Sequence, residues 1–177
     1  ARLVTGVPTC ALPIYNPPGP WAQVGLGGNP KFKRDDGDKL YRRSIYTYWK
    51  RSAPAPNMQI FDAPTREICI MKRPRTNTPL QALVTLNDTQ FVEAARMLAQ
   101  RAMIEGGAQA ESREEYIVEL VTARKPNSLE KETMDKVYQR AFRKYRTTPG
   151  LAKDLLQVGE TKTDPSLPAA EHAAMTI

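Results

Sequence analysis

The feature that most constrains the fold is a run of apolar residues at helical spacing in the last third of the chain. Starting at Met134, apolar side chains recur at i+3, i+4, i+7, i+8 and i+11, namely Val137, Tyr138, Ala141, Phe142 and Tyr145. These positions share one face of an α-helix, so the spacing predicts a helix that buries this face in a core. We expect Ser128 to cap its N-terminus.

Capping signals predict two helices before it. Thr78, Pro79 and Gln81 fit a capping box with proline at the first helical position, which predicts a helix over 79–86. Asn87 or Asp88 can cap the next helix, over 88–105, which Gly106 and Gly107 would end. The inward face predicted for that helix is Phe91, Ala95, Leu98, Ala99 and Ala102, with Glu93, Arg96, Gln100 and Arg101 elsewhere.

Three further helices are predicted towards the end of the sequence. The Ser112 to Glu115 spacing fits a second capping box and predicts a helix over 113–124, with Ile117, Leu120 and Val121 facing inward. Pro149 starts a short helix closed by Gly159, and Ser166 caps a last helix that reaches Ile177. The predicted fold class is therefore mainly α: a small bundle of five or six short helices over 76–177.

The region before the bundle, residues 15–75, carries the positive charge of the chain. The net charge is +7, and residues 31–75 contain twelve basic and five acidic residues, so the whole excess falls there. This Pro-rich region is expected to be mostly irregular, with one or two short strands, one of them near 43–49. Aromatic residues alternate there with a basic face formed by Arg42, Arg43, Lys50 and Arg51.

The basic face has two interpretations. Cations interleaved with aromatic rings could bind phosphates and stack on bases, as in a nucleic-acid-binding module. A half-buried strand with arginine and lysine at its ends gives the same pattern, and we favour this second interpretation.

Cysteine and histidine are too few for the usual metal and haem sites. Cys69 and His172 are far apart, and no Cys-x-x-Cys-His motif occurs, so no metal site is expected in this chain. No apolar run approaches the roughly 18 residues that a transmembrane helix needs.

The first residues form a separate case. The stretch VTGVPTCALPI, residues 4–14, has no helical or strand period and resembles a translated sequencing adapter. We interpret residues 1–14 as adapter-derived rather than native and set Cys10 aside with them. The native protein is expected to extend beyond both ends of this sequence.

Long stretches of the remaining chain resemble one protein family. The run LYRRSIYTYWKRSAPAPNMQIFDAPTREICIMKRPRTNTPLQALVTLNDTQFVEAARMLAQR, residues 40–101, closely resembles the C-terminal part of a planctomycete-type domain of unknown function, DUF1553. VTARKPNSLEKETM and LLQVGE are similar to the distal helices of the same family. The resemblance covers residues 15–177.

The resemblance implies which domains accompany this one and where the protein is located, but it implies no particular reaction. Members are large, exported bacterial proteins that combine this domain with a DUF1549-type domain, often with a haem c-type module and sometimes with a carbohydrate-binding-like module. It implies a periplasmic or cell-surface location and a structural or interaction role, with any haem in a neighbouring domain and no cofactor in this chain. The alternatives are a carbohydrate-active hydrolase using carboxylates such as Asp62 and Glu67 and, second, a nucleic-acid-binding module.

Polar residues of the family-like segment form a candidate binding site. They are Arg73, Arg75, Asn77, Asn87 and Asp88, together with Asp62 and Arg66. Arginines beside Asn and Asp could bind an anionic ligand or a polysaccharide through paired hydrogen bonds. Structurally, Asn87 and Asp88 could instead cap a helix while the arginines pair with Asp62 or Glu67, and we favour this account. No catalytic residue is assigned.

Overall fold

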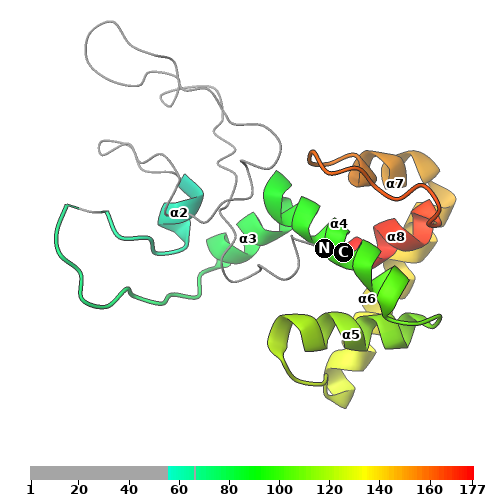
Figure 1. Cartoon of the computed structure of the whole chain (residues 1–177), viewed down its shortest axis with the longest axis horizontal. Helices are drawn as coiled ribbons and strands as arrows, with labels where there is room; N and C mark the ends of the chain where they lie inside the picture. Colours follow the sequence, from blue (N-terminus) through cyan, green and yellow to red (C-terminus); the bar gives the residue numbers. More distant parts are fainter. Residues whose placement is uncertain (1–55, 66) are drawn as a thin grey trace, which may run out of the picture. The chain divides into compact units, whose positions relative to one another are not determined.

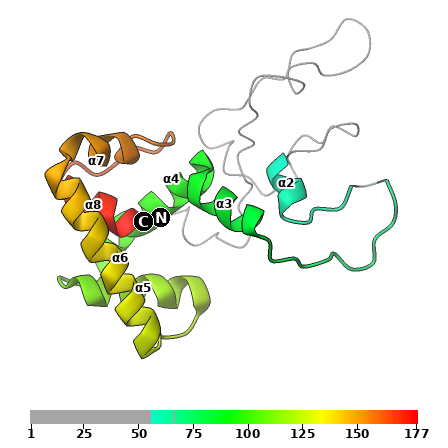
Figure 2. The same cartoon turned by 180° about the vertical axis from the view of Figure 1, so that it is seen from behind.

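The computed structural model describes residues 56–65 and 67–177 (Figures 1 and 2). Within these residues the chain forms seven α-helices and no strand, which confirms the mainly α class. The strand predicted near 43–49, the basic face of Arg42, Arg43, Lys50 and Arg51, and residues 1–14 all lie outside the described residues.

The chain divides into two compact units, residues 1–91 and 92–177. The division falls inside helix α4, Thr89–Glu105, whose first residues belong to the first unit. The predicted division at residues 75 and 76, between a basic irregular region and a helical region, stays a prediction.

The first unit contains helices α2, Pro56–Ile60, and α3, Pro79–Asn87. Helix α2 was not predicted, because the Pro-rich region was expected to be mostly irregular; proline is equally suited to the first turn of a helix. The capping box that opens α3 is confirmed in both directions, from Gln81 N to Thr78 Oγ1 and from Thr78 N to Gln81 Oε1. Met58 is buried, and the rings of Phe61 and Phe91 lie 5.5 Å apart.

Helix α5, Ala110–Thr122, corrects the prediction based on Ser112. It begins two residues before Ser112, with Gln109 at the N-cap position and no side-chain capping hydrogen bond. The predicted inward face is also wrong in part, since Leu120 and Val121 are exposed. The residue of α5 that is buried is Glu114, which the sequence analysis did not select.

Helix α6, Ser128–Thr147, has a different cap from the one predicted. Asn127, not Ser128, occupies the N-cap position: its side chain accepts from Glu130 N at 2.8 Å, and Glu130 Oε2 accepts from Asn127 N at 2.9 Å. Arg124 donates to both Glu130 carboxylate oxygens, and these bonds together lower the pKa of Glu130 to about 2.

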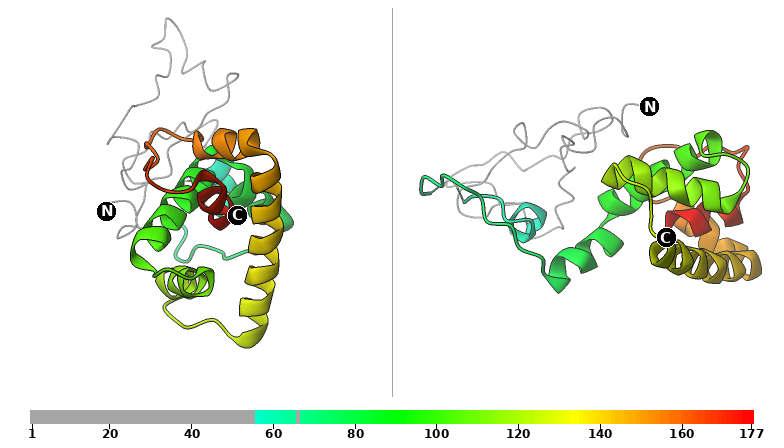
Figure 3. Two further views of the ribbon diagram at one scale, coloured as in Figure 1. Left: turned by 90° about the vertical axis from the view of Figure 1, so that its right-hand side faces the viewer. Right: turned by 90° about the horizontal axis from the view of Figure 1, so that it is seen from below.

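Helices α7, Pro149–Leu156, and α8, Ala169–Thr176, complete the second unit. Pro149 starts α7 as predicted, whereas α8 has Pro168 at its N-cap position and Ser166 instead donates to Asp164. In the left view of Figure 3, α7 lies near one end of α6, α5 near the other, and α8 between them.

The core of the second unit lies where α6, α7 and α8 meet. Its buried residues are Ala141, Tyr145, Ala152, Ala173 and Ala174, with Tyr138 and Phe142 packed against them. The small alanine side chains allow the backbones of the three helices to approach closely, and α8, although only eight residues long, is well packed against α6 and α7. The face predicted for α6 is largely confirmed, although Val137 remains 44% exposed.

The α6 cap gives a direct test of the fold. Asn127→Ala is expected to lower the free energy of unfolding by about 1 kcal/mol, because it leaves the Glu130 N–H without its acceptor. Ser128→Ala, one residue later, is the matched control and should change it by less than about 0.5 kcal/mol. Urea denaturation measures both, and an equal loss in the two variants would contradict the assignment of the cap.

Candidate functional site

Asp62 is the predicted site residue with the most defined surroundings. It follows α2 in the left-handed conformation, with φ of 58°, and its Oδ2 accepts hydrogen bonds from Thr76 N at 2.9 Å and Thr76 Oγ1 at 2.7 Å. These two bonds, helped by Gln81 and by the positive charge of Arg73, lower the pKa of Asp62. The carboxylate is therefore committed to closing a chain loop between residues 62 and 76.

Gln81 reinforces the same closure. Its side chain is buried, and Nε2 donates to Ile60 O at 2.8 Å and to Thr76 Oγ1 at 3.0 Å while Oε1 serves the capping box. One glutamine thus ties the end of α2, the end of the loop and the start of α3 together. The sequence predicted its capping role but not the two bonds to distant residues.

The other predicted site residues of the first unit do not converge on Asp62 as a group. Asn87 donates to Leu83 O at 2.8 Å at the end of α3, and Asp88 Oδ1 accepts from Gln90 N at 3.0 Å at the start of α4. Asp88 thus has the capping role expected from the structural account, whereas Asn87 is the last residue of α3 and bonds back to its own helix. Arg73, Arg75, Asn77 and Glu67 are exposed, and Arg66 lies outside the described residues. Their role in ligand binding stays a prediction.

A second polar cluster, in the unit of residues 92–177, was missed by the sequence analysis. Glu93 and Arg96 of α4 were predicted to lie away from the core, but both are buried, with exposed fractions of 5% and 0%. Glu93 Oε1 accepts from the backbone N–H groups of Glu160 and Thr161, at 3.0 and 2.8 Å. The carboxylate therefore holds the connection between α7 and α8.

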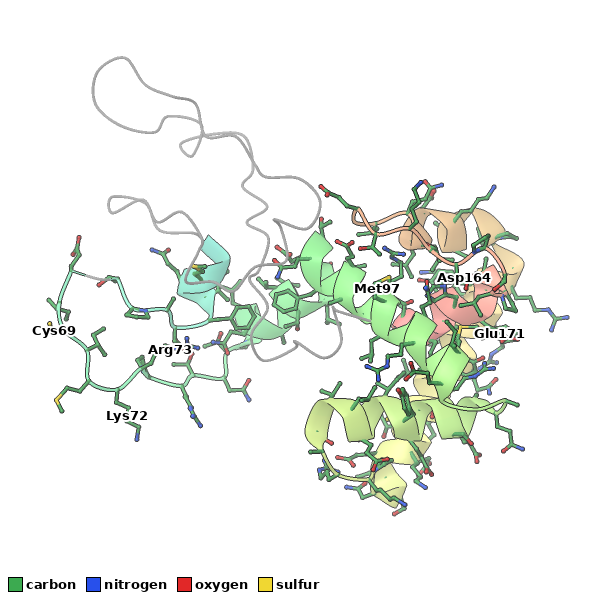
Figure 4. The ribbon with its side chains drawn as sticks, viewed as in Figure 1. Cys69, Lys72, Arg73, Met97, Asp164 and Glu171 are labelled. Carbon is green, nitrogen blue, oxygen red and sulfur yellow. The ribbon has the colours of Figure 1, made fainter. Side chains whose placement is uncertain are left out.

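Arg96 binds the same connection beside Glu93. Its Nη2 donates to Thr161 O at 2.6 Å and its Nη1 to Thr163 Oγ1 at 2.8 Å, and Nη2 lies 3.9 Å from Glu93 Oε1. One turn further along α4, Gln100 Oε1 accepts from Asp164 N at 3.0 Å, and Figure 4 shows Asp164 on this connection. We call the group formed by Glu93, Arg96 and Gln100 the α4 clamp.

His172 links α8 to the clamp. The ring is fully buried, and Nε2 donates to Arg96 O at 2.9 Å, since a carbonyl oxygen can only accept. Burial lowers the pKa of His172, and the positive charge of Arg96 acts in the same direction, so the imidazole is neutral at pH 7. A buried, neutral ring that binds a backbone carbonyl positions α8 and has no access to a substrate in solvent.

Glu114 of α5 differs from these groups because it lacks equivalent partners. It is 6% exposed, and its Oε1 has no hydrogen-bond partner among the described residues. Burial, and then the charges of Asp135 and Glu111, raise its pKa to about 7. It lines a cavity of about 220 Å³ between α5 and α6, together with Glu115, Lys131 and Glu132. The signal in the sequence was its position three residues before Ile117, on an apolar face.

Three further features of the described residues concern metal ligands, disulfides and membrane spans. Across residues 56–65 and 67–177, no group of three or more histidine, cysteine, aspartate or glutamate side chains is arranged to hold a metal ion. Cys69 is exposed and forms no disulfide there. None of the helices described is long and apolar enough to cross a bilayer.

Comparison with known proteins identifies a family. Residues 7–138 match the family model described as PSD1, protein of unknown function (DUF1553). The match includes residues 7–14 of the adapter-like stretch, whose origin stays a prediction. No curated protein and no solved structure matches the chain.

The α4 clamp can be tested at Gly159. This glycine has φ of 92°, and a Cβ there would collide with the Glu93 carboxyl group. Gly159→Ala is expected to lower the free energy of unfolding by more than about 1 kcal/mol, because both the backbone and the clamp must shift. In the control Gly150→Ala, no atom lies within 4 Å of the added Cβ. Thermal denaturation should show no loss for this variant; comparable losses would argue against the clamp.

The raised pKa of Glu114 predicts a pH dependence of stability. The folded state holds this proton up to about pH 7, whereas the unfolded carboxyl releases it near its ordinary pKa of 4.5. The free energy of unfolding of the wild type therefore falls as the pH rises from 4.5 to about 7. Glu114→Gln cannot ionise and does not show this fall. Relative to the wild type, the variant should gain stability across that window and keep the gain above it.

Urea unfolding at a series of pH values measures the effect of Glu114→Gln. Glu119→Gln removes the same charge from an exposed position on α5 and is the matched control. Parallel stability profiles for the wild type and Glu114→Gln would contradict the raised pKa.

Proposed function

We propose that this chain, which belongs to the DUF1553 family, is a structural and interaction domain of a large, exported, multidomain bacterial protein of planctomycete type. Its partners would be the other domains of the same protein, of DUF1549 type and haem c type, with polysaccharide-related modules in the same assembly. Any haem would be bound by those neighbours. The location that fits this proposal is periplasmic or cell-surface.

The observation that carries the proposal is an exposed apolar and basic loop, residues 67–75. Ile68 and Met71 are 71% and 104% exposed, and Ile70 is 41% exposed. Lys72, Arg73 and Arg75 follow directly, and Figure 4 labels Lys72 and Arg73 on this loop. Consecutive exposed apolar residues beside cations are typical of a protein interaction surface and carry a cost in water unless a partner covers them.

Hydrogen bonds fix the two ends of the segment that contains this loop. Thr76 binds Asp62 at one end, and Gln81 binds Ile60 and Thr76 just beyond it. Of the two carboxylates considered for catalysis, Asp62 is thus engaged in holding the loop, whereas Glu67 is exposed. This arrangement supports docking over hydrolysis, because the Asp62 carboxylate already accepts two hydrogen bonds from Thr76.

The interaction is tested by changing the loop surface and measuring binding to the other domains of the full-length protein. Ile68→Asp is expected to weaken binding of the DUF1549-type or haem c-type domain by about tenfold or more, the effect of losing one apolar contact residue. Isothermal titration calorimetry with separately expressed domains gives the affinity.

Leu129→Asp is the matched control, because Leu129 on α6 is 70% exposed and lies in the other unit. It should leave the affinity unchanged. Equal affinity for Ile68→Asp and the wild type, or no binding of either domain to the wild type, would count against the proposal.

A further inference from the structure

The second unit contains an apolar cavity that the proposed function does not use. It has a volume of about 320 Å³ and is bordered by α4, α5, α6 and α8, whose arrangement the left view of Figure 3 shows. Its walls include Leu98, Ile117, Val137, Tyr138 and Met175. The cavity is open to solvent on one side, and its volume falls at the lower end of the range for small-molecule sites.

One ionisable carboxyl group lies in this apolar wall. Glu114 lines the 320 Å³ cavity and also the acidic 220 Å³ cavity between α5 and α6, so it stands where the two meet. It is more than nine-tenths buried, and its Oε1 lacks a hydrogen-bond partner among the described residues. A buried carboxyl oxygen with no donor is unusual in a folded protein and calls for an explanation.

The charges around Glu114 favour a positively charged donor. Glu111 and Asp135 act on it as like charges, and Glu115 and Glu132 line the adjoining cavity. Lys131 is the one cation in the described lining of that cavity, and it is paired with Glu115. From α8, Glu171 is paired with Arg113 at 3.4 Å. The local field is therefore negative, and an ammonium group is stabilised there more than a neutral donor.

We propose that this cavity binds a small organic amine, with an ammonium group at Glu114 and a short alkyl or aryl group against the apolar walls. The ammonium donates to the Glu114 carboxylate and offsets the like charges around it. The apolar group fills space bordered by Leu98, Ile117 and Val137. This inference concerns residues 92–177 and is independent of the docking loop at residues 67–75.

The test compares amines with neutral molecules of the same shape. The probes are 2-phenylethylamine and hexylamine, with 2-phenylethanol and hexan-1-ol as their neutral counterparts, titrated into the whole chain at about pH 8, where Glu114 is ionised. Isothermal titration calorimetry and amide NMR shifts on α5 and α8 measure binding. Each amine is expected to bind about tenfold or more tightly than its alcohol, because it adds a charge-assisted hydrogen bond.

Two variants separate the cavity from general charge attraction. Glu114→Gln keeps the shape of the side chain and should reduce amine affinity by about tenfold or more while leaving alcohol affinity unchanged. Glu119→Gln removes the same charge outside both cavities and should change neither. Equal binding of amine and alcohol, equal losses in the two variants, or no saturable binding by the wild type would each overturn the proposal.

Discussion

The structure of the second unit depends on two buried charges of α4 and the backbone that they hold. Glu93 accepts two N–H groups from the connection between α7 and α8, and Arg96 donates to a carbonyl and a hydroxyl oxygen of the same connection. Burying a charge is costly unless such partners compensate. Because the partners are mostly backbone groups, the interaction fixes the path of the chain between α7 and α8 and so determines where α8 begins.

The consequences extend through α8 to the cavity. His172 joins α8 to the backbone of Arg96, and Ala173 and Ala174 then pack against α6 and α7. The next residues, Met175 and Thr176, form part of the wall of the apolar cavity near Glu114. The helix that the clamp positions therefore forms one wall of the cavity, so a loss of the clamp would loosen α8 and disturb that wall.

The sequence predicted what depends on near neighbours. The Thr78 and Gln81 capping box and the start of α7 at Pro149 follow from contacts within four residues, and both are confirmed. The sequence analysis wrongly chose three serines as N-caps: Ser112, Ser128 and Ser166. Serine also occurs within the first turn of a helix, as at Ser112 and Ser128, and in turns before a helix, as at Ser166 beside Asp164, so a serine near a helix start does not identify the cap position. Glu93 and Arg96 were misplaced for a different reason: their partners lie more than 60 residues away, and helical periodicity assigns charged residues to the solvent. The strand and basic face predicted before residue 56 lie outside the described residues.

Two buried carboxylates of the second unit, Glu93 and Glu114, differ in whether the protein itself supplies their hydrogen-bond donors. Glu93 and Glu114 look alike in the sequence, since each is a glutamate within an amphipathic helix. Glu93 meets two backbone N–H groups and a nearby guanidinium, so its capacity to accept hydrogen bonds serves the fold. Glu114 meets like charges and keeps an oxygen without a donor in the described structure, so its capacity is left for something that the fold does not supply. The same residue type is therefore structural at one position and a candidate for recognition at the other, and the difference lies in the partners rather than in burial.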